Sequence, residues 1–252
     1  MANEFSDQQY WAIILGGSSG LGLAAARKLA SHGMHLCIVH RDPGVEMEKV
    51  NAAFDEIRAT GVQVLTFNAD VTRADKRAQI LETLQASIAS RASVQNEDTL
   101  QASITSRPSA QDQDSTQASI ASHTSAQDQD ITQASITPRT SAQSQDNTQA
   151  GPPGNGKIRC LLHSIARGTL KAMLPETGTA LSIDDYRITL DSMAYSLYEW
   201  VKDISALQLF ASDARVLSFT SEGSHRAWKH YGAVSAAKAA LEAISRNIAL
   251  EF

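Results

Sequence analysis

A short apolar strand, a glycine turn and a helix follow one another near the N-terminus and constrain the fold more than any other feature. Tyr10 to Leu15 is an apolar run of strand length, and GGSSGLG and the helix-forming LAAARKLASHG come directly after it. Glycine permits a tight turn and lets an anion approach the backbone amides at a helix N-terminus, where the dipole favours negative charge. An ordinary flexible turn is the alternative. The order of elements favours a phosphate-binding turn in an α/β domain.

Length, charge and cysteine use exclude several classes of protein. The chain has 252 residues, which suits one α/β domain or two small ones, and its formal net charge of −5 argues against nucleic acid as a partner. No apolar run is long enough to span a bilayer, and the first residues lack the basic region and cleavage site of a signal peptide. Cys37 and Cys160 fall in apolar runs, so we expect buried, reduced thiols in a cytoplasmic protein. We assign no metal ligands.

Two more strands follow in the first third of the chain. His35 to Val39 is one, with Arg41 just after it, and Val62 to Phe67 is the other. In dinucleotide-binding folds an acidic residue after the second strand binds ribose hydroxyls, whereas an arginine accommodates a 2′-phosphate. Arg41 therefore favours NADPH over NADH, although Asp42 weakens that preference and Arg41 is alternatively a solvated loop charge. Asp70 follows the third strand and is a candidate helix cap.

A repeat of sixteen residues interrupts the domain. It begins QASIASRASVQNEDTL at Gln85 and recurs with Gln at positions 101, 117, 133 and 149. Its residues are mostly Ser, Gln, Ala, Thr and Asp, and so little apolar surface does not offset the entropy of ordering the chain. We predict that Gln85 to Gly156 is a disordered insertion in a surface loop. Residues 1–84 and 157–252 then form the two parts of one domain.

The domain resumes at Lys157 with the buried strand IRCLLHSIARG. The residues HSIA stand at the carboxyl end of that strand, where α/β sheets bind ligands; we assign His163 no chemical role. We predict a helix from the N-cap Ser182 to about Leu209 and a strand from Arg215 to Thr220. Residues 167–179 form a loop in a position suited to a substrate entrance.

The last segment places a phenol and an ammonium on one side of a helix. Apolar residues recur at steps of three and four from Val234 to Ile248, which predicts an amphipathic helix against the sheet. Tyr231 and Lys238 are seven positions apart, or about 10 Å along the helix axis, so they can line one site. The alternative is a tyrosine that opens the helix and a solvated lysine.

These motifs together resemble the short-chain dehydrogenase/reductase superfamily. Most members have Tyr-x-x-x-Lys and Asn-Asn-Ala-Gly, whereas six residues separate Tyr231 from Lys238 here and HSIA replaces the second motif. In both of these features the sequence resembles the NADPH-dependent enoyl-acyl-carrier-protein reductases. The resemblance covers roughly residues 10–82 and 157–252 and implies a Rossmann-type, doubly wound parallel sheet. Family members continue beyond the Tyr/Lys helix, so we expect this chain to be a fragment or a truncated form.

The resemblance also implies roles for particular residues. Tyr231 would stabilise an enolate oxygen, Lys238 would hold the nicotinamide ribose, and Ser221 would either bind the substrate carbonyl or cap a turn. Asp70 and Val71 would lie beside the adenine and Ser164, Ile165 and Ala166 beneath the nicotinamide. The full set implied to bind the cofactor is Gly16, Ser18, Ser19, Gly20, Leu21, Gly22, Arg41, Asp70, Val71, Ser164, Ile165, Ala166 and Lys238.

The function implied is reduction of an enoyl thioester in fatty-acid biosynthesis, with NADPH as the cofactor and NADH as a possible substitute. The substrate would be carried on acyl carrier protein, and the enzyme would be a homo-oligomer without a nucleic-acid or membrane partner. Two alternatives stay open. One is another reductase of the superfamily, acting on a 3-oxoacyl thioester or a carbonyl compound. The other is an inactive cofactor-binding or scaffold protein.

Overall fold

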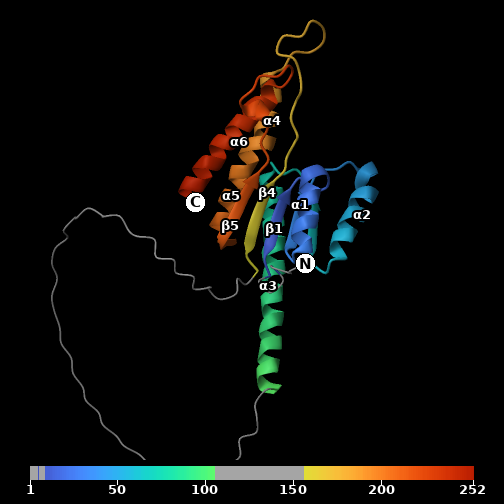
Figure 1. The fold of residues 1–252 in the computed structure, drawn as a ribbon, viewed down its shortest axis with the longest axis vertical. Coiled ribbons are helices and arrows are strands. Elements are labelled where there is room, and N and C mark those ends of the chain that lie inside the picture. Colours follow the sequence, from blue (N-terminus) through green and yellow to red (C-terminus); the bar gives the residue numbers. More distant parts are fainter. Residues whose placement is uncertain (1–4, 6–8, 106–155) are drawn as a thin grey trace, which may run out of the picture.

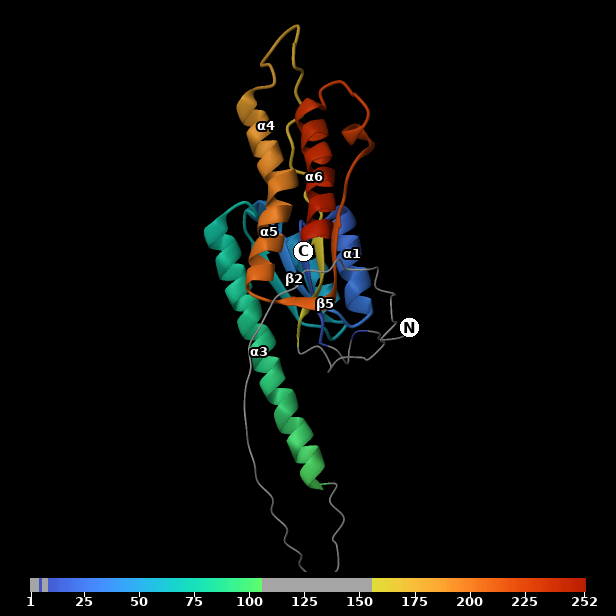
Figure 2. The ribbon, with the colours of Figure 1, turned by 90° about the vertical axis from the view of Figure 1, so that its left-hand side faces the viewer.

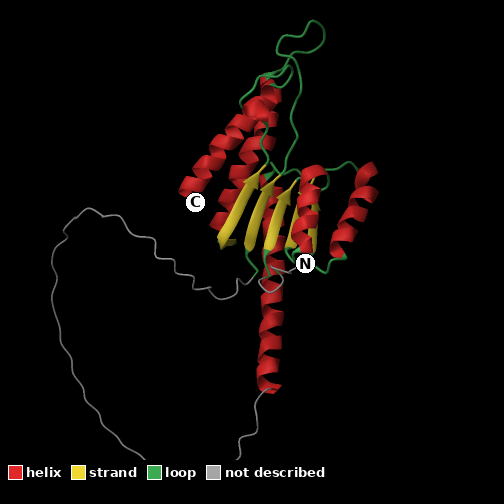
Figure 3. Cartoon of the chain, viewed as in Figure 1, coloured by secondary structure: helices red, strands yellow, loops and turns green. Residues whose placement is uncertain are grey.

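The computed structural model describes residue 5 and residues 9–105 and 156–252, and it contains a five-stranded parallel sheet. The strands are β1 (Trp11–Leu15), β2 (His35–His40), β3 (Val64–Asn68), β4 (Ile158–His163) and β5 (Phe210–Ser218). Their order across the sheet is β3-β2-β1-β4-β5, and every neighbouring pair is parallel (Figures 1 and 3). The predicted Rossmann-type doubly wound sheet is confirmed. The order reverses between β1 and β4, the place where such sheets bind ligands.

Helices cover both faces of the sheet. They are α1 (Gly20–Ser31), α2 (Met47–Arg58), α3 (Ala74–Thr105), α4 (Ile183–Leu190), α5 (Ser196–Ala206) and α6 (Gly232–Glu251). Side chains of β1 alternate between the faces. Ile14 packs in a core with α1 and α2, whereas Ile13 packs in a second core with residues of α3, α5 and α6. The three central strands, β2, β1 and β4, are thus buried on both sides, as their continuous apolar runs predict.

Helix α3 is longer than the sequence indicated. The predicted disordered insertion begins at Gln85, but the helix continues to Thr105 and extends well beyond the sheet (Figure 2). Leu84 is buried and Ile88 packs against the core. The segment between Gly61 and Pro108 contains no other glycine or proline, and lengthening an anchored helix avoids the cost of nucleation. The expectation of disorder is therefore wrong for residues 85–105, and residues 106–155 lie outside the described residues.

The helix predicted from Ser182 to Leu209 is also modified. Ser182 is its N-cap, as predicted, and forms a capping box with Asp185. The helix is interrupted by a π-helical segment, Asp191–Tyr195, between α4 and α5. The next strand begins at Phe210 rather than Arg215. Its first residues were not predicted as strand, because they are half-exposed and lack the continuous apolar character that marks a buried strand.

Both cysteines are buried and free, as predicted. Burial raises the pKa of the Cys37 thiol to about 12 and also raises that of Cys160, so neither is an activated nucleophile. Within the described ranges, no group of three or more His, Cys, Asp or Glu side chains is placed to hold a metal ion. None of the helices among these residues combines the length and apolar character that crossing a membrane requires.

Candidate active site

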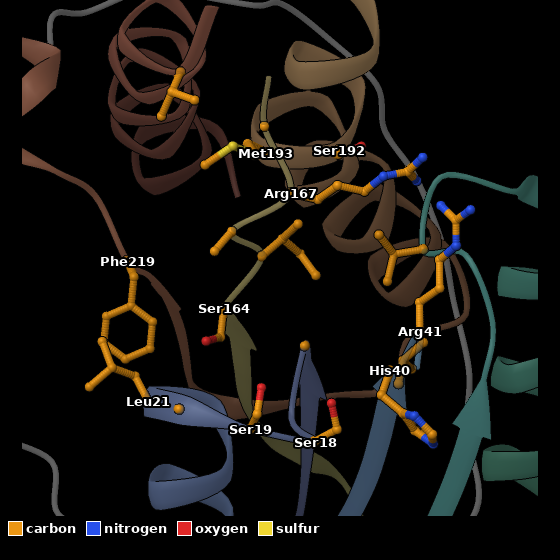
Figure 4. Close-up of a pocket in the computed structure, with 18 of the residues that line it drawn as sticks. Ser18, Ser19, Leu21, His40, Arg41, Ser164, Arg167, Ser192, Met193 and Phe219 are labelled. Carbon is orange, nitrogen blue, oxygen red and sulfur yellow. The ribbon is translucent and has the colours of Figure 1, made fainter. Parts of the chain in front are cut away.

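A cavity of about 780 Å³ opens at the carboxyl edge of the sheet, where the strand order reverses (Figure 4). This volume lies in the range of about 300–1,000 Å³ that small-molecule and cofactor sites occupy. All the residues predicted to bind the cofactor line it except Gly22, which packs within the glycine turn. Tyr231 and Ser221 line it too. The fold therefore brings residues from the first and last thirds of the chain into one site.

The glycines of the turn serve two physical purposes. A Cβ added at Gly16 would lie 2.4 Å from the carbonyl oxygen of Ser164, and one added at Gly22 would lie 2.1 Å from the carbonyl oxygen of Gly16. These two glycines permit close packing of the turn against β4. Gly20 has φ +54°, and a Cβ there would meet nothing within 4 Å. The backbone at Gly20 therefore stands open beside the cavity.

The start of α1 fits the phosphates of a dinucleotide. The N-cap residue is Ser19, and its side chain makes no capping hydrogen bond to the helix. The amides of the first turn have no partners within the helix, and they carry the positive end of the helix dipole. Uncapped amides beside the open backbone of Gly20 form a cradle for an anion. The residues present thus fit the cofactor that the fold implies.

An ion-pair cluster bounds the cavity at the ends of β2 and β3. Arg41 Nη1 donates to Asp70 Oδ2 at 2.8 Å, and Arg167 Nη1 donates to the same oxygen at 3.0 Å. Partial burial would raise the pKa of Asp70, but hydrogen bonds from Thr72 and Arg41 outweigh it and lower that pKa. Helix α3 begins at Ala74 and the Asp70 carboxylate bonds Thr72, so Asp70 does not cap the helix.

Arg167 was missed by sequence reasoning, although it directly follows HSIA. Figure 4 shows its side chain and that of Arg41 on the same side of the cavity. The sequence separation of Arg167 from Asp70 is 97 positions, so no local pattern links the two residues. Arg41 is paired rather than a free solvated charge, and both guanidinium groups stand at the cavity with one carboxylate between them.

The predicted reactive residues meet at the other end of the cavity. Tyr231 directly precedes α6, and its hydroxyl lies 3.2 Å from Ser221 Oγ. Ser221 Oγ also accepts a hydrogen bond from the Gly223 amide at 3.2 Å, so Ser221 caps the turn, and its contact with a substrate carbonyl stays a prediction. The Lys238 side chain is 5% exposed and donates from Nζ to the carbonyl oxygen of Phe219 at 2.6 Å. Burial lowers the pKa of Lys238.

Glu242 anchors the turn that carries Ser221, and no sequence pattern indicated this contact. Its Oε1 accepts hydrogen bonds from Thr220 Oγ1 at 2.5 Å and from Ser224 Oγ at 2.7 Å. Glu242 lies one helical turn after Lys238 on α6. The residues on either side of Ser221 are thereby fixed to the same helix that carries Lys238.

A second cavity, of about 940 Å³, lies on the other side of Tyr231. The loop containing Met173 and Leu174 forms one wall, and the loop containing Trp228 forms the other. Tyr231 lines both cavities. The loop expected to form a substrate entrance thus borders a space that reaches the tyrosine and is lined by both apolar and polar side chains.

Comparison with known families gives two matches that together span most of the chain. The model described as "Enoyl-(Acyl carrier protein) reductase" matches residues 105–252, and the model described as "short chain dehydrogenase" matches residues 10–95. The 3-dehydrosphinganine reductase TSC10A of Arabidopsis thaliana is 41% identical over 71 residues, which are 28% of this chain and 21% of that protein. The 17-beta-hydroxysteroid dehydrogenase type 3 of Rattus norvegicus is 37% identical over 76 residues, or 30% of this chain and 24% of that one.

The matched segments therefore span less than a quarter of the length of these curated relatives. Solved structures share the fold at low identity. A Serratia marcescens short-chain dehydrogenase/reductase superposes with a TM-score of 0.59 at 16% identity, covering 98% of this chain and 69% of that one. A 3-oxoacyl-[acyl-carrier protein] reductase from Brucella melitensis gives a TM-score of 0.53 at 16% identity, covering 96% and 70%. With its NAD(P)-binding Rossmann fold and these matches, the chain belongs to the short-chain dehydrogenase/reductase family of oxidoreductases.

Proposed function

We propose that this protein reduces the double bond of an enoyl thioester with NADPH. The observation that carries the proposal is that Tyr231, Lys238 and the glycine turn line one cavity, with Tyr231 also bordering a second one. The wide spacing of Tyr231 and Lys238 and the match of residues 105–252 to the enoyl reductase model support this chemistry over other reductions. We further propose acyl carrier protein as the carrier of the thioester, and a homo-oligomer in the cytoplasm as the active form.

Each residue of the site has a part that follows from its position. A bound nicotinamide cofactor supplies the hydride that reaches the β carbon of the thioester. Negative charge then develops on the thioester carbonyl oxygen, and the Tyr231 hydroxyl donates a hydrogen bond to it. A proton from Tyr231 or from water then reaches the α carbon, which gives the saturated thioester. Lys238, held by the Phe219 carbonyl, keeps the local field positive and would hold the ribose of the bound cofactor. The second cavity beside Tyr231, in which Met173 and Trp228 provide apolar surface, receives the acyl group.

Reduction of a carbonyl group is the second candidate, and one contact favours it. The hydroxyls of Ser221 and Tyr231 are 3.2 Å apart, so both can bind the same substrate oxygen. Proteins similar to this chain carry the names 3-dehydrosphinganine reductase and 3-oxoacyl-[acyl-carrier protein] reductase, both of which describe carbonyl substrates. An inactive cofactor-binding or scaffold protein is the third candidate, and it predicts no turnover of any thioester.

Matched substrates separate the candidates. NADPH oxidation by the full chain is followed with crotonyl-CoA and with acetoacetyl-CoA, and the products are identified by mass. We expect butyryl-CoA from the first and little turnover of the second. A higher kcat/KM with acetoacetyl-CoA would transfer the assignment to the carbonyl reductases. Turnover of neither thioester, with NADPH still bound, would exclude both for these acyl groups.

We also predict that Arg41 selects the phosphorylated cofactor. Arg41→Gln removes a guanidinium from the cavity, so the Kd for NADPH should rise by about 10- to 100-fold, the scale of a lost charge-assisted pair, while the Kd for NADH changes little. Both constants are measured by fluorescence titration. Arg58→Gln is the matched control, because Arg58 pairs with Asp55 on the surface of α2, away from the cavity. An equal loss of affinity for both cofactors would show that Arg41 does not read the 2′-phosphate.

A further inference from the structure

The π-helical segment Asp191–Tyr195 forms part of the wall of the cofactor cavity. The amide of Ser196 bonds the carbonyl oxygen five residues earlier, which widens the helix at this point. Such π-helical turns within α-helices are frequent at functional sites. The segment presents Ser192 and Met193 to the cavity, where both are seen in Figure 4. Met193 also packs in a small apolar cluster with Tyr231.

A buried hydrogen-bond chain ties this segment to the sheet. Ser196 Oγ donates to the carbonyl oxygen of Ser192 at 2.8 Å, the group that its amide would bond in a regular α-helix. His163 Nε2 lies 2.8 Å from the same Ser196 Oγ. A hydroxyl has one hydrogen, and that of Ser196 points to Ser192, so His163 must be the donor in its own bond. The geometry thereby fixes the imidazole as the tautomer protonated at Nε2.

His163 is well placed to act as a rigid anchor. It ends β4 directly before Ser164, is fully buried, and its carbonyl oxygen accepts a hydrogen bond from the Phe219 amide at 3.2 Å. Its Nδ1 is buried and has no hydrogen-bond partner among the described residues. Burial, and then the charge of Lys238, lower the pKa of His163 to about 3. The ring is therefore neutral near pH 7 and serves as a hydrogen-bond donor rather than a proton carrier.

We propose that His163 is a positioning residue that holds the π-helical segment through Ser196 and so sets the place of Met193 beside Tyr231. This assigns a part to the histidine of HSIA, which the reaction itself does not use. The carrying observation is the continuous chain from His163 through Ser196 to the Ser192 carbonyl, all within the buried interior. The structural claim stands without any assumption about the substrate, whereas its kinetic consequence rests on the proposed function.

The structural claim is tested by NMR on the full chain labelled with ¹³C at the methionine methyl groups. Met193→Leu assigns the Met193 signal. We expect His163→Leu and Ser196→Ala each to shift or broaden that signal, while the signal of Met34, in the core on the other face of the sheet, stays in place. In His163→Gln the Met193 signal should return to its wild-type position, because the amide nitrogen of glutamine reaches the position of the histidine Nε2. A Met193 signal unchanged in the first two variants, or not restored by glutamine, would overturn the proposal.

The kinetic consequence is tested with whichever thioester the wild-type protein reduces. His163→Leu and Ser196→Ala should each lower kcat/KM by about 10- to 100-fold, the scale of a displaced active-site wall. The double variant should lose no more than either single variant, because both remove the same chain of contacts. Additive losses would contradict the proposal.

Two outcomes would leave part of the test to other measurements. If the wild-type protein reduces neither thioester, the proposed function fails and the NMR experiment alone decides on His163. If His163→Leu does not fold, Ser196→Ala and His163→Gln decide.

Discussion

Replacing Tyr231 with phenylalanine should lower kcat/KM for the thioester by about 10²- to 10⁴-fold, the contribution of a positioned acid group. The change removes one oxygen and keeps the ring, so packing against Trp228, whose ring centroid is 5.2 Å away, is preserved. Cofactor affinity should stay within about 2-fold of the wild-type value, because the assigned part of Tyr231 concerns the substrate oxygen. Steady-state kinetics give the first quantity and fluorescence titration gives the second.

Tyr198→Phe is the control for this experiment. Tyr198 lies on α5, is partly exposed and does not line either cavity beside Tyr231. Loss of the Tyr198 hydroxyl should leave both kcat/KM and the affinity for the cofactor unchanged. Equal turnover by the wild-type protein and by Tyr231→Phe would mean that the hydroxyl neither donates a proton nor stabilises charge in the rate-limiting step.

Replacing Lys238 with methionine should impair both cofactor binding and turnover. Methionine has a similar length and suits a buried position, but it removes the ammonium and its 2.6 Å hydrogen bond to the Phe219 carbonyl. We expect the Kd for NADPH to rise about 10-fold and kcat/KM to fall by about 10²- to 10³-fold, as when one preorganised charged donor is lost. Titration of the cofactor and steady-state kinetics measure the two effects.

Lys49→Met provides the matched control, because Lys49 is an exposed lysine on α2. Circular dichroism of both variants checks that the fold is retained. If Lys238→Met bound NADPH and turned over substrate as the control does, the buried lysine would have only a structural part. If Lys238→Met lost turnover but kept its affinity for NADPH, the result would contradict the proposed contact between Lys238 and the ribose.

The parts of the site that the sequence predicted are those set by local backbone geometry. Gly16 and Gly22 are required by close packing at the start of α1, so their spacing between a strand and a helix indicates a phosphate-binding loop. Tyr231 and Lys238 are brought together by the regular rise of a single helix. The sheet order follows from the alternation of strands and helices, for which right-handed crossover connections leave few arrangements.

The parts that sequence reasoning missed depend on contacts between distant segments. Arg167 is held by an ion pair with Asp70, which follows another strand. Glu242 accepts hydrogen bonds from the turn that precedes its helix. The π-helical segment was missed because apolar residues from Ile183 to Ile204 fit a continuous helix equally well. The length of α3 was missed because low apolar content argues against a packed core but does not prevent an anchored helix from continuing.

The central claim is that the cavity shared by the glycine turn, Tyr231 and Lys238 carries out hydride transfer to a thioester. The most direct test uses NADPH labelled with deuterium at the transferred position, together with crotonyl-CoA and the full chain. We expect the wild-type protein to form butyryl-CoA with deuterium at the β carbon, and Tyr231→Phe to form it at least about 100-fold more slowly. Bound cofactor with no deuterium transferred to crotonyl-CoA or to acetoacetyl-CoA would contradict it.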